Sequence, residues 1–271
     1  MSAYQKYLEA AREAAREAGA LLRGDFFKPG DVFLKGEINL VTKSDTESQN
    51  LILNRLSGAF SGHDFLAEEG LAQLGGAEFR WIFDPLDGTT NFVHRFPVFC
   101  VSIGLEHRGK LACGVVYNPM TEEMFWAARG DGAYFNGQKI RVSRIDSLNR
   151  GLLATGFPYD IRETNTNVSQ HDLFLLRTQG IRRCGSAALD LCFVASGRLD
   201  GFWEMKLNPW DTAAGAIIVE EAGGRVTDFL GQPVNIYHPE VVASNGLLHE
   251  EMLEVLRLAG DDEERRNGGR I

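Results

Sequence analysis

The chain has 271 residues, of which 44% are hydrophobic and 24% are charged, so it carries enough apolar material for a substantial core and lacks the composition of a disordered protein. Its formal net charge of −9 gives no long-range attraction for nucleic acid or for an anionic membrane surface. Charged residues from Glu9 to Glu17 and the lack of any run of 18 apolar residues exclude a secretory signal and a membrane span, so we expect a cytoplasmic protein.

The four cysteines are predicted to be buried free thiols. They lie in apolar surroundings, without C-x-x-C spacing and without a nearby pair of histidines, so neither a disulfide framework nor a zinc site is indicated. These residues are Cys100, Cys113, Cys184 and Cys192.

The periodicity predicts helices at the start of the chain and antiparallel strands in its centre. Apolar residues at steps of three and four from Tyr4 to Leu22 indicate one face of a helix. The run Ser44-Asp45-Thr46-Glu47 matches a capping box and predicts the start of a second helix, with Thr42 and Asp45 at its mouth. Short β-rich runs separated by turn residues then predict a meander. Its strands are expected at 98–105, 111–117 and 124–128.

The second half of the chain alternates helical and extended patterns. Residues 186–195 are expected to be helical and 200–205 extended, and an apolar helix over 212–222 is expected to end at Gly223-Gly224. Because no composition break or internal repeat divides the chain, residues 1–260 are predicted to form one domain, which could have two lobes. Residues 261–271 are charged and are predicted to form a flexible tail.

The segment Trp81 to Phe92, W-I-F-D-P-L-D-G-T-T-N-F, carries most of the chemical information. An apolar strand runs into Asp84 and Asp87, with Pro85 favouring an extended Asp84 and Gly88 allowing a tight turn, so both carboxylates could project toward one point. A surface turn is the simpler interpretation of Asp-Pro-x-Asp-Gly alone, since these are all turn-forming residues. The threonine pair that follows adds hydroxyl and N–H groups that favour a phosphate site.

Three further acids stand in similar positions. Glu68 and Glu69 end an apolar run before Gly70, and Asp211 follows Pro209-Trp210 at a helix start. Alone, the two glutamates fit solvated acids and Asp211 fits a helix cap. If Glu68 and Asp211 meet the two aspartates, each pair of acids at about 4 Å would repel by about 4 kcal/mol at an effective dielectric constant of about 20.

Such a cluster of hard oxygen ligands requires cations, and Mg²⁺ or Mn²⁺ fits it better than zinc. Metal ions would in turn allow an acidic pocket to bind a phosphate group. Other phosphate chemistry is not indicated, because the chain has no P-loop motif, and the spacing of Asp84 and Asp87 differs from that of phosphatases that form an aspartyl-phosphate. The pattern therefore favours attack by water.

These motifs resemble those of the inositol monophosphatase family. The resemblance rests on Ala67-Glu68-Glu69, on the segment 81–92 and on Trp210-Asp211 before a helix that ends Glu221-Ala222-Gly223-Gly224, and it extends over about residues 5–260. It implies a layered α/β/α/β/α sugar-phosphatase sandwich of the α+β class, usually a homodimer, with lithium-sensitive activity.

The resemblance also implies roles for single residues. Two or three Mg²⁺ ions are expected, with Mn²⁺ as a possible substitute, and the first would be bound by Glu68, Asp84 and the Leu86 carbonyl. Asp84, Asp87 and Asp211 would bind the second ion. The N–H groups of Gly88 and Thr89 would hold the phosphate, and Glu68 and Thr89, the latter bonded to Asp45, would orient the attacking water. The substrate contacts are expected at Asp87, Gly185, Ser186, Ala187 and Glu204.

The substrate is the least determined part of the prediction. A small phosphorylated polyol or sugar is expected, with myo-inositol monophosphate first. Fructose 1,6-bisphosphate, histidinol phosphate, 3′-phosphonucleotides and NADP are alternatives, because Lys206-Leu207-Asn208 and the stretch 160–170 should border the leaving-group pocket and differ among relatives. An alternative of another class is a binding factor in ribosomal-RNA transcription complexes, for which Arg182, Arg183 and Arg198 are the candidate basic residues.

Overall fold

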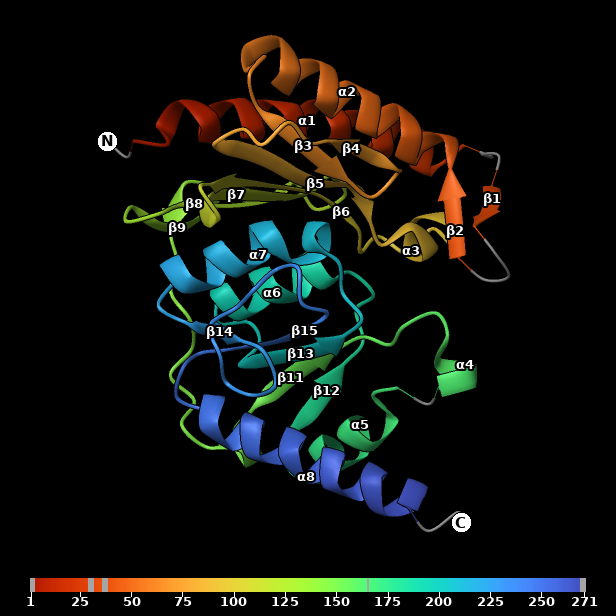
Figure 1. Ribbon diagram of the computed structural model, residues 1–271, viewed down its shortest axis with the longest axis vertical. Coiled ribbons are helices and arrows are strands. Elements are labelled where there is room, and N and C mark those ends of the chain that lie inside the picture. The colour runs from red at the N-terminus through yellow and green to blue at the C-terminus, as the bar shows by residue number, and fades with distance from the viewer. Residues whose placement is uncertain (1–2, 29–31, 36–38, 165, 269–271) are drawn as a thin grey trace.

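The computed structural model describes residues 3–28, 32–35, 39–164 and 166–268 and arranges them in five layers (Figure 1). Two helices cover one face of an eight-stranded sheet, two more lie between this sheet and a five-stranded sheet, and the last two cover the outer face of the second sheet. In this order the helices are α1 (Gln5–Phe26), α2 (Lys43–Ala59), α6 (Ala187–Ala195), α7 (Pro209–Glu221), α5 (Val168–Leu175) and α8 (His249–Gly268). This confirms the α/β/α/β/α sandwich.

The eight-stranded sheet contains the predicted meander. Its order is β10-β9-β8-β7-β6-β5-β3-β4, antiparallel throughout except for the parallel pair β3 and β5. The strands are β3 (Asp64–Ala67), β4 (Leu71–Gln73), β5 (Phe79–Asp87), β6 (Cys100–His107), β7 (Lys110–Asn118), β8 (Glu123–Ala128), β9 (Gly132–Phe135) and β10 (Gln138–Lys139). The predicted strands at 98–105, 111–117 and 124–128 are thus confirmed as β6, β7 and β8.

The five-stranded sheet has the order β12-β11-β13-β15-β14. Its strands are β11 (Leu152–Thr155), β12 (Gly180–Arg182), β13 (Gly201–Met205), β14 (Arg225–Thr227) and β15 (Glu240–Ser244). The short hairpin of β1 (Val32–Lys35) and β2 (Asn39–Thr42), the helices α3 (Thr89–Val93) and α4 (Ile161–Thr164), and the turn η1 (Leu148–Arg150) complete the described chain.

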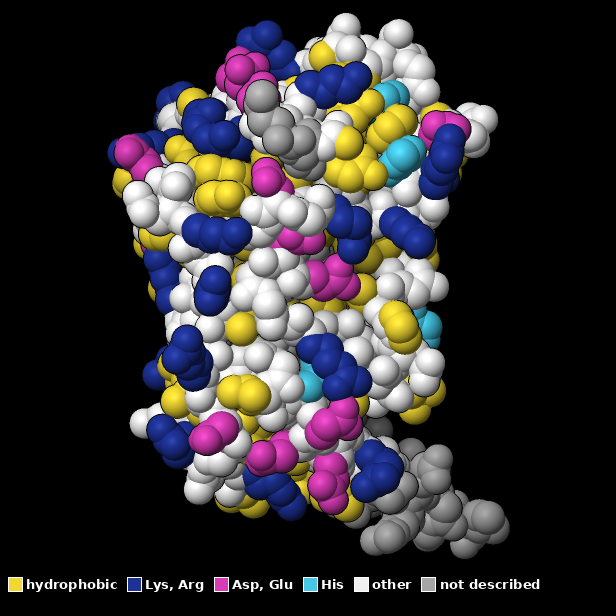
Figure 2. Space-filling view, turned by 90° about the vertical axis from the view of Figure 1, so that its left-hand side faces the viewer, with side chains coloured by type: hydrophobic (Ala, Val, Ile, Leu, Met, Phe, Trp, Pro, Cys, Tyr) yellow, Lys and Arg dark blue, Asp and Glu magenta, His cyan; other side chains and the backbone are white. Residues whose placement is uncertain are grey.

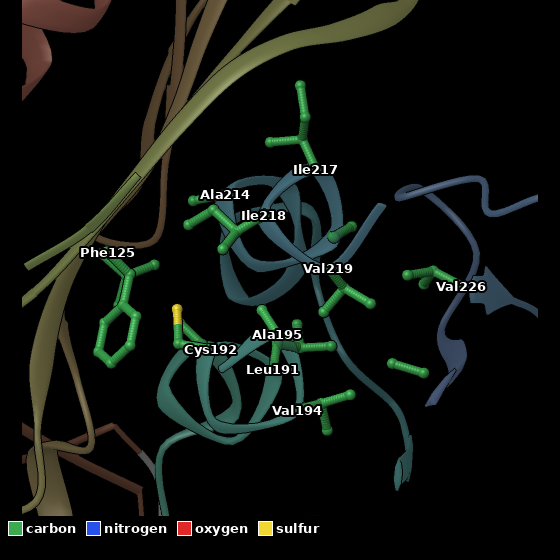
Figure 3. Close-up of a cluster of buried hydrophobic side chains, with 14 of the residues drawn as sticks. Phe125, Leu191, Cys192, Val194, Ala195, Ala214, Ile217, Ile218, Val219 and Val226 are labelled. Atoms are coloured by element: carbon green, nitrogen blue, oxygen red, sulfur yellow. The ribbon is translucent and has the colours of Figure 1, made fainter. Parts of the chain in front are cut away.

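The middle helices bring the two sheets together through small residues. Side chains of α6 and α7 interleave in a buried apolar cluster, shown in Figure 3. On the other side of α7, a Cβ atom at Gly104 would lie 2.8 Å from Ala213 Cβ, and one at Gly114 would lie 2.7 Å from Ala214 Cα. Such distances are too short for carbon atoms in contact, so these glycines let α7 lie directly on β6 and β7. This packing fixes the start of α7, where Asp211 lies, beside the sheet.

The second helix begins differently from the prediction. The capping box is formed by Thr42 and Asp45 and not by Ser44 and Glu47: Thr42 caps α2, and the Asp45 carboxylate accepts a hydrogen bond of 2.8 Å from the Thr42 N–H. Both pairs fit the sequence pattern. Ser44 lies inside the helix and donates to Asp25 instead, which places the box two residues earlier.

Other predictions are confirmed at the ends of helices. Ser186 caps α6, and α7 ends at Glu221, with Ala222 as its cap and Gly223 at a φ of 88°. The backbone of 261–268 belongs to α8, whereas 269–271 lie outside the described residues, so the flexible tail stays a prediction. Among the helices that the structure describes, none is both long enough and apolar enough to cross a bilayer.

The cysteine prediction holds for three of the four thiols. Cys100, Cys113 and Cys192 are buried and free of disulfides. Cys184 is also a free thiol, but it is only partly buried, because it lies in the loop between β12 and α6 and not within a sheet or helix.

Candidate active site

A bulge in β5 places two aspartates on the same side of the sheet. Residues three apart in a regular strand face opposite sides, but between the pairs Asp84–Ser102 and Asp87–Cys100 two residues of β5 lie opposite one of β6. Ile82 packs in the cluster on the side of α6 and α7, whereas Phe83 and Leu86 both pack on the side of α1 and α2. The extra residue therefore turns both carboxylates toward α6 and α7, where they line one cavity.

The turn after β5 is tied to the loop that precedes α6. Gly88 has a φ of 97°, and a Cβ atom there would lie 3.0 Å from the Val98 carbonyl oxygen and 3.2 Å from that of Gly185. Asn91 joins the same segments, since its Nδ2 donates to the Val98 carbonyl at 2.7 Å and to the Cys184 carbonyl at 2.8 Å. The predicted phosphate turn and substrate loop thus touch each other.

Asp87 is fixed by the start of α6. Its Oδ2 accepts hydrogen bonds from the Ser186 hydroxyl at 2.6 Å and from the Ala188 N–H at 2.9 Å, and the Cys100 thiol lies 3.7 Å away. These donors favour the ionised carboxylate, although burial of Asp87 raises its pKa. The helix start therefore aligns a carboxylate that belongs to the first sheet.

Asp84 and Asp211 are each held in place by neighbouring backbone. Asp84 Oδ1 accepts from the Leu86 N–H at 2.9 Å, and Asp211 Oδ2 accepts from the Asn208 N–H at 2.7 Å in the capping box of α7. The cap predicted as the simpler role of Asp211 is thus real, but Asp211 is the third helical residue of the box and not the N-cap. In both residues these bonds engage one carboxylate oxygen and leave the second for a ligand.

The cavity has a volume of about 690 Å³ and gathers eleven of the twelve predicted site residues. Those on its wall are Glu68, Asp84, Leu86, Asp87, Gly88, Thr89, Gly185, Ser186, Ala187, Glu204 and Asp211. Of the two stretches predicted to border the leaving-group pocket, 160–170 and 206–208, residues 160–162 and 206–208 line the cavity as well. Asp84 and Asp87 are thus buried in the cavity and do not form a surface turn, and Asp211 lines the cavity in addition to its role in the helix cap.

Asp45 lies behind the wall and acts on the cavity through Thr89. The Thr89 hydroxyl lies 3.0 Å from Asp45 Oδ1 and 3.1 Å from the Leu86 carbonyl oxygen, and it can donate its one proton to either acceptor. Asp45 is fully buried, and its Oδ2 accepts bonds from both the N–H and the hydroxyl of Thr42. Burial raises the pKa of Asp45, and these hydrogen bonds lower it in part.

The shared burial of the acids makes their simultaneous ionisation unfavourable. Burial raises the pKa of Asp84 well above its usual value, and the charges of Glu68, Asp87 and Asp211 raise it further. The pKa of Asp211 is also well above its usual value, through burial and through Asp87. Burial and mutual repulsion thus disfavour the ionised carboxylates, and either protons or cations would relieve the repulsion.

The donor set suits a hard divalent cation, although the side chains do not enclose one by themselves. In the part of the chain that the structure describes, no group of three or more His, Cys, Asp or Glu side chains is arranged so that it could hold a metal ion. The carboxylates line one cavity, but Asp84, Asp87 and Asp211 each accept a hydrogen bond from a backbone N–H group and do not converge on one point. All available ligands are oxygen atoms, whose mutual repulsion a cation relieves, so the residues fit Mg²⁺.

The sequence analysis missed several residues of the cavity wall, among them Gly156, Arg183 as a site residue, and Asp190. A signal existed for Asp190, because it is the single charged residue in the otherwise apolar helix Ala187–Ala195. Gly156 carried no such signal. Its importance depends on Glu204, which lies on β13 and comes close only in the folded chain.

The five layers and the acidic cavity define a phosphatase of the layered sugar-phosphatase class. Residues 3–260 match the inositol monophosphatase family, and the chain belongs to this family. Its members are metal-dependent, generally on Mg²⁺, and lithium sensitivity is a general property of the family.

Three relatives illustrate the similarity. An inositol-1-monophosphatase of Synechocystis sp. is 44% identical over 256 residues, which cover 93% of this chain and 89% of the relative. The structure of the inositol monophosphatase from Anabaena (Nostoc) sp. matches with a TM-score of 0.86 and 41% identity, over 94% of this chain and 96% of that one. A Pseudomonas aeruginosa protein named Nus factor SuhB is 40% identical and covers 93% of this chain and 96% of its own length.

Proposed function

We propose that this protein hydrolyses the phosphate monoester of a small polyol, with myo-inositol monophosphate as the preferred substrate. The observation that carries the proposal is a single cavity that joins the acids Glu68, Asp84, Asp87 and Asp211 to the loop 185–187 and to Glu204. The acids suit cation-dependent phosphate chemistry, and the loop and Glu204 offer hydrogen-bonding groups to hydroxyls.

In this proposal Mg²⁺ is held by the acids at the end of β5. Glu68, Asp84 and the Leu86 carbonyl would bind one ion, and Asp84, Asp87 and Asp211 would bind a second. We expect two or three ions in use and Mn²⁺ as a substitute. When bound, the ions neutralise the carboxylates, polarise the phosphate and favour ionisation of water. The support is the oxygen-only donor set and the raised pKa values of Asp84 and Asp211.

The protein contributes the orientation of the reacting groups. The N–H groups of Gly88 and Thr89 are proposed to bind the phosphate. Thr89 donates its proton to Asp45, which leaves the hydroxyl oxygen free to accept a hydrogen bond from the attacking water. Glu68 is proposed to accept the second proton of that water, so that its lone pair points at phosphorus opposite the leaving alkoxide.

The polyol is proposed to lie against Gly185, Ser186, Ala187 and Glu204. Burial raises the pKa of Glu204 well above its usual value, and the neighbouring charge of Asp190 raises it further. A substrate hydroxyl can both donate and accept hydrogen bonds, so it can bind Glu204 in either protonation state.

The test is release of inorganic phosphate from inositol, sugar, histidinol and nucleotide phosphates, each with Mg²⁺ and with a chelator. We expect the highest kcat/KM for myo-inositol 1-phosphate and no turnover with the chelator. Full turnover in the chelator would refute the chemistry, and a clear preference for fructose 1,6-bisphosphate, histidinol phosphate, a 3′-phosphonucleotide or NADP would replace the substrate.

A second candidate function, binding in ribosomal-RNA transcription complexes, is favoured by the name of the Pseudomonas relative. Two of the three candidate arginines lie in different surroundings, however. Arg183 lines the cavity, and Arg198 pairs with Glu123 at 2.7 Å. On the face shown in Figure 2, Lys and Arg side chains are interspersed with Asp and Glu side chains. Fluorescence anisotropy with ribosomal leader RNA, alone and with transcription factors, would test this function.

We further propose a cytoplasmic homodimer without a membrane or nucleic-acid partner. The free thiols support a reducing compartment, and the homodimer is proposed from the family to which the chain belongs. Light scattering on the purified protein would give the oligomeric state.

A further inference from the structure

Asp190 is a buried acid of the cavity wall for which the proposed chemistry has no role. It lies in the first turn of α6, lines the cavity and is 1% exposed. Its Oδ1 atom is buried without a hydrogen-bond partner. A buried carboxyl oxygen without a partner is unfavourable, so such atoms commonly bind a ligand or water.

The surroundings of Asp190 are those of a polyol site. Glu204 and Arg183 line the same cavity, and the charge of Asp190 acts on Glu204. Burial raises the pKa of Asp190 to about 8, whereas the neighbouring Cys184 thiol and Arg183 lower it. The wall thus presents two acidic groups and one guanidinium to a substrate that carries several hydroxyls.

We propose that Asp190 is a specificity-determining residue that binds a hydroxyl group of the polyol through its unpartnered oxygen, beside the hydroxyl bound by Glu204. This inference rests on the proposed function, because it needs a hydroxylated substrate in the cavity. It predicts that the site recognises at least two hydroxyls through acids, one on β13 and one on α6. Substrates without hydroxyls gain nothing from either acid.

A purely structural role is the competing explanation. Asp190 could hold the loop 184–186 in place through Cys184, and its loss would then affect every substrate equally. Cys184 offers the matched control, because it adjoins Asp190 but does not line the cavity. Cys184→Ala removes the thiol without removing the carboxyl group.

The experiment compares myo-inositol 1-phosphate with cyclohexyl phosphate, which has the same ring without the hydroxyls. Asp190→Leu is expected to lower kcat/KM for the inositol ester about tenfold more than for the cyclohexyl ester, mainly through KM, as for the loss of one hydrogen bond. Asp190→Asn, which keeps hydrogen-bonding capacity, should restore most of this ratio. Cys184→Ala should leave the ratio as in the wild type, and thermal melts show that each variant is folded.

The outcomes separate this inference from the proposed function. Wild-type turnover of the inositol ester with an unchanged ratio in Asp190→Leu would overturn the inference alone, as would an equal loss in Asp190→Leu and Cys184→Ala. Wild-type enzyme that turns over neither ester would overturn the proposed function, and the inference with it. If Asp190→Leu does not fold, Asp190→Ser takes its place. Its ratio of kcat/KM for the inositol ester to that for the cyclohexyl ester is expected to be lower than in Asp190→Asn, and a wild-type ratio would overturn the inference.

Discussion

The two walls of the cavity are built in different ways. The acidic wall is centred on β5, an interior strand of the larger sheet, where Asp84 is 2% exposed and Asp87 8% and both carboxylates accept hydrogen bonds from backbone N–H groups. Glu68, which follows β3, and Asp211, which lies in α7, complete it. The other wall combines Asp190 of α6 and Glu204 of β13 with separate loops around the smaller sheet, and some of its residues lie at the rim. Tyr159 is 49% exposed, and Lys206 pairs with Asp160 where both side chains are over 40% exposed.

This difference separates chemistry from selectivity. Changes in the acidic wall disturb a shared core and coupled charges, whereas changes in the loops exchange contacts one at a time. Variants of the acidic wall should therefore have large effects on every substrate. Variants of the loop wall should have small effects that depend on the substrate.

The largest effect is expected for Asp84→Asn, which removes the carboxylate proposed to contact both ions. The kcat for phosphate release should fall on the order of 10³-fold or more, for inositol and cyclohexyl esters alike. Asp64→Asn is the matched control, because Asp64 is also a buried acid, but it accepts hydrogen bonds from the N–H groups of Gly75 and Gly76 outside the cavity. It should lower stability and leave kcat near the wild-type value. A near-normal kcat in Asp84→Asn would contradict the assignment of the chemistry to the acidic wall.

Thr89→Ala should give the next largest loss, about 10²-fold in kcat, because the attacking water loses the hydroxyl oriented by Asp45. Thr89→Ser keeps the hydroxyl and should recover most of the activity. Steady-state kinetics at saturating substrate distinguish the two variants. Equal loss in both would mean that packing of the Thr89 methyl group, and not its hydroxyl, is required.

Removing Mg²⁺ should lower the free energy of unfolding by about 2 kcal/mol relative to protein with Mg²⁺ at about thirty times its Kd.

The stability of the chelated protein should also depend on pH. The pKa of Asp84 is raised in the folded state and that of Asp190 is about 8, against about 3.9 in an unfolded chain. Protonation therefore stabilises the chelated fold fully below about pH 4, and this stabilisation is lost as the pH rises to about 8.

Thermal melts between about pH 5 and pH 8 check this pH dependence. With a chelator, Tm should fall as the pH rises, and Mg²⁺ should reduce the fall because it favours the ionised carboxylates. An equal fall of Tm with pH in the presence and absence of Mg²⁺ would show that the titrating acids do not bind the ion.

Gly156→Ala tests the loop wall, and its expected effect is a change of about tenfold in KM. A Cβ atom at Gly156 would lie 2.1 Å from Glu204 Oε1, so the methyl group must displace the carboxylate. We expect KM for the inositol ester to rise about tenfold, as for one lost hydrogen bond. In the Glu204→Ala background the same change should cost nothing further. Additive losses in this double-mutant cycle would show that Gly156 acts on something other than Glu204.

The smallest effect is expected for Lys206→Gln, which breaks the ion pair with Asp160. An exposed pair contributes about 0.2–1 kcal/mol, so kcat/KM should change by less than about fivefold. Competition between inositol and sugar phosphates would measure whether this small change alters selectivity. A loss as large as that of Thr89→Ala would contradict the assignment of the rim to selectivity alone.

Local patterns predicted the elements that depend on neighbours in the sequence. The apolar stripe gave α1, the turn residues gave the strands β6 to β8, and Gly223 marked the end of α7. The site acids were also predictable, because an apolar strand runs directly into Asp84 and Asp87, and the threonines that follow add groups suited to a phosphate.

The remaining features depend on contacts between distant residues. Either of two overlapping capping boxes, Thr42–Asp45 or Ser44–Glu47, could start α2. The hydrogen bond from Thr89 to Asp45 favours the first, in which the Asp45 carboxylate closes the box. The bulge in β5 depends on pairing with β6, and the strand continues through Asp87 to the turn at Gly88. The close contact between Gly156 and Glu204 forms only because the folded chain places β13 beside Gly156. None of these contacts leaves a periodic pattern in the sequence.

The most direct test of the central claim is to locate the ions by anomalous diffraction from crystals soaked in Mn²⁺ and an unreactive substrate analogue. The account predicts Mn²⁺ peaks at coordination distance from Glu68 and Asp84 and from Asp87 and Asp211, with occupancy lost in Asp84→Asn. Active enzyme whose crystals show no peak in this cavity, or peaks bound only by other residues, would contradict it.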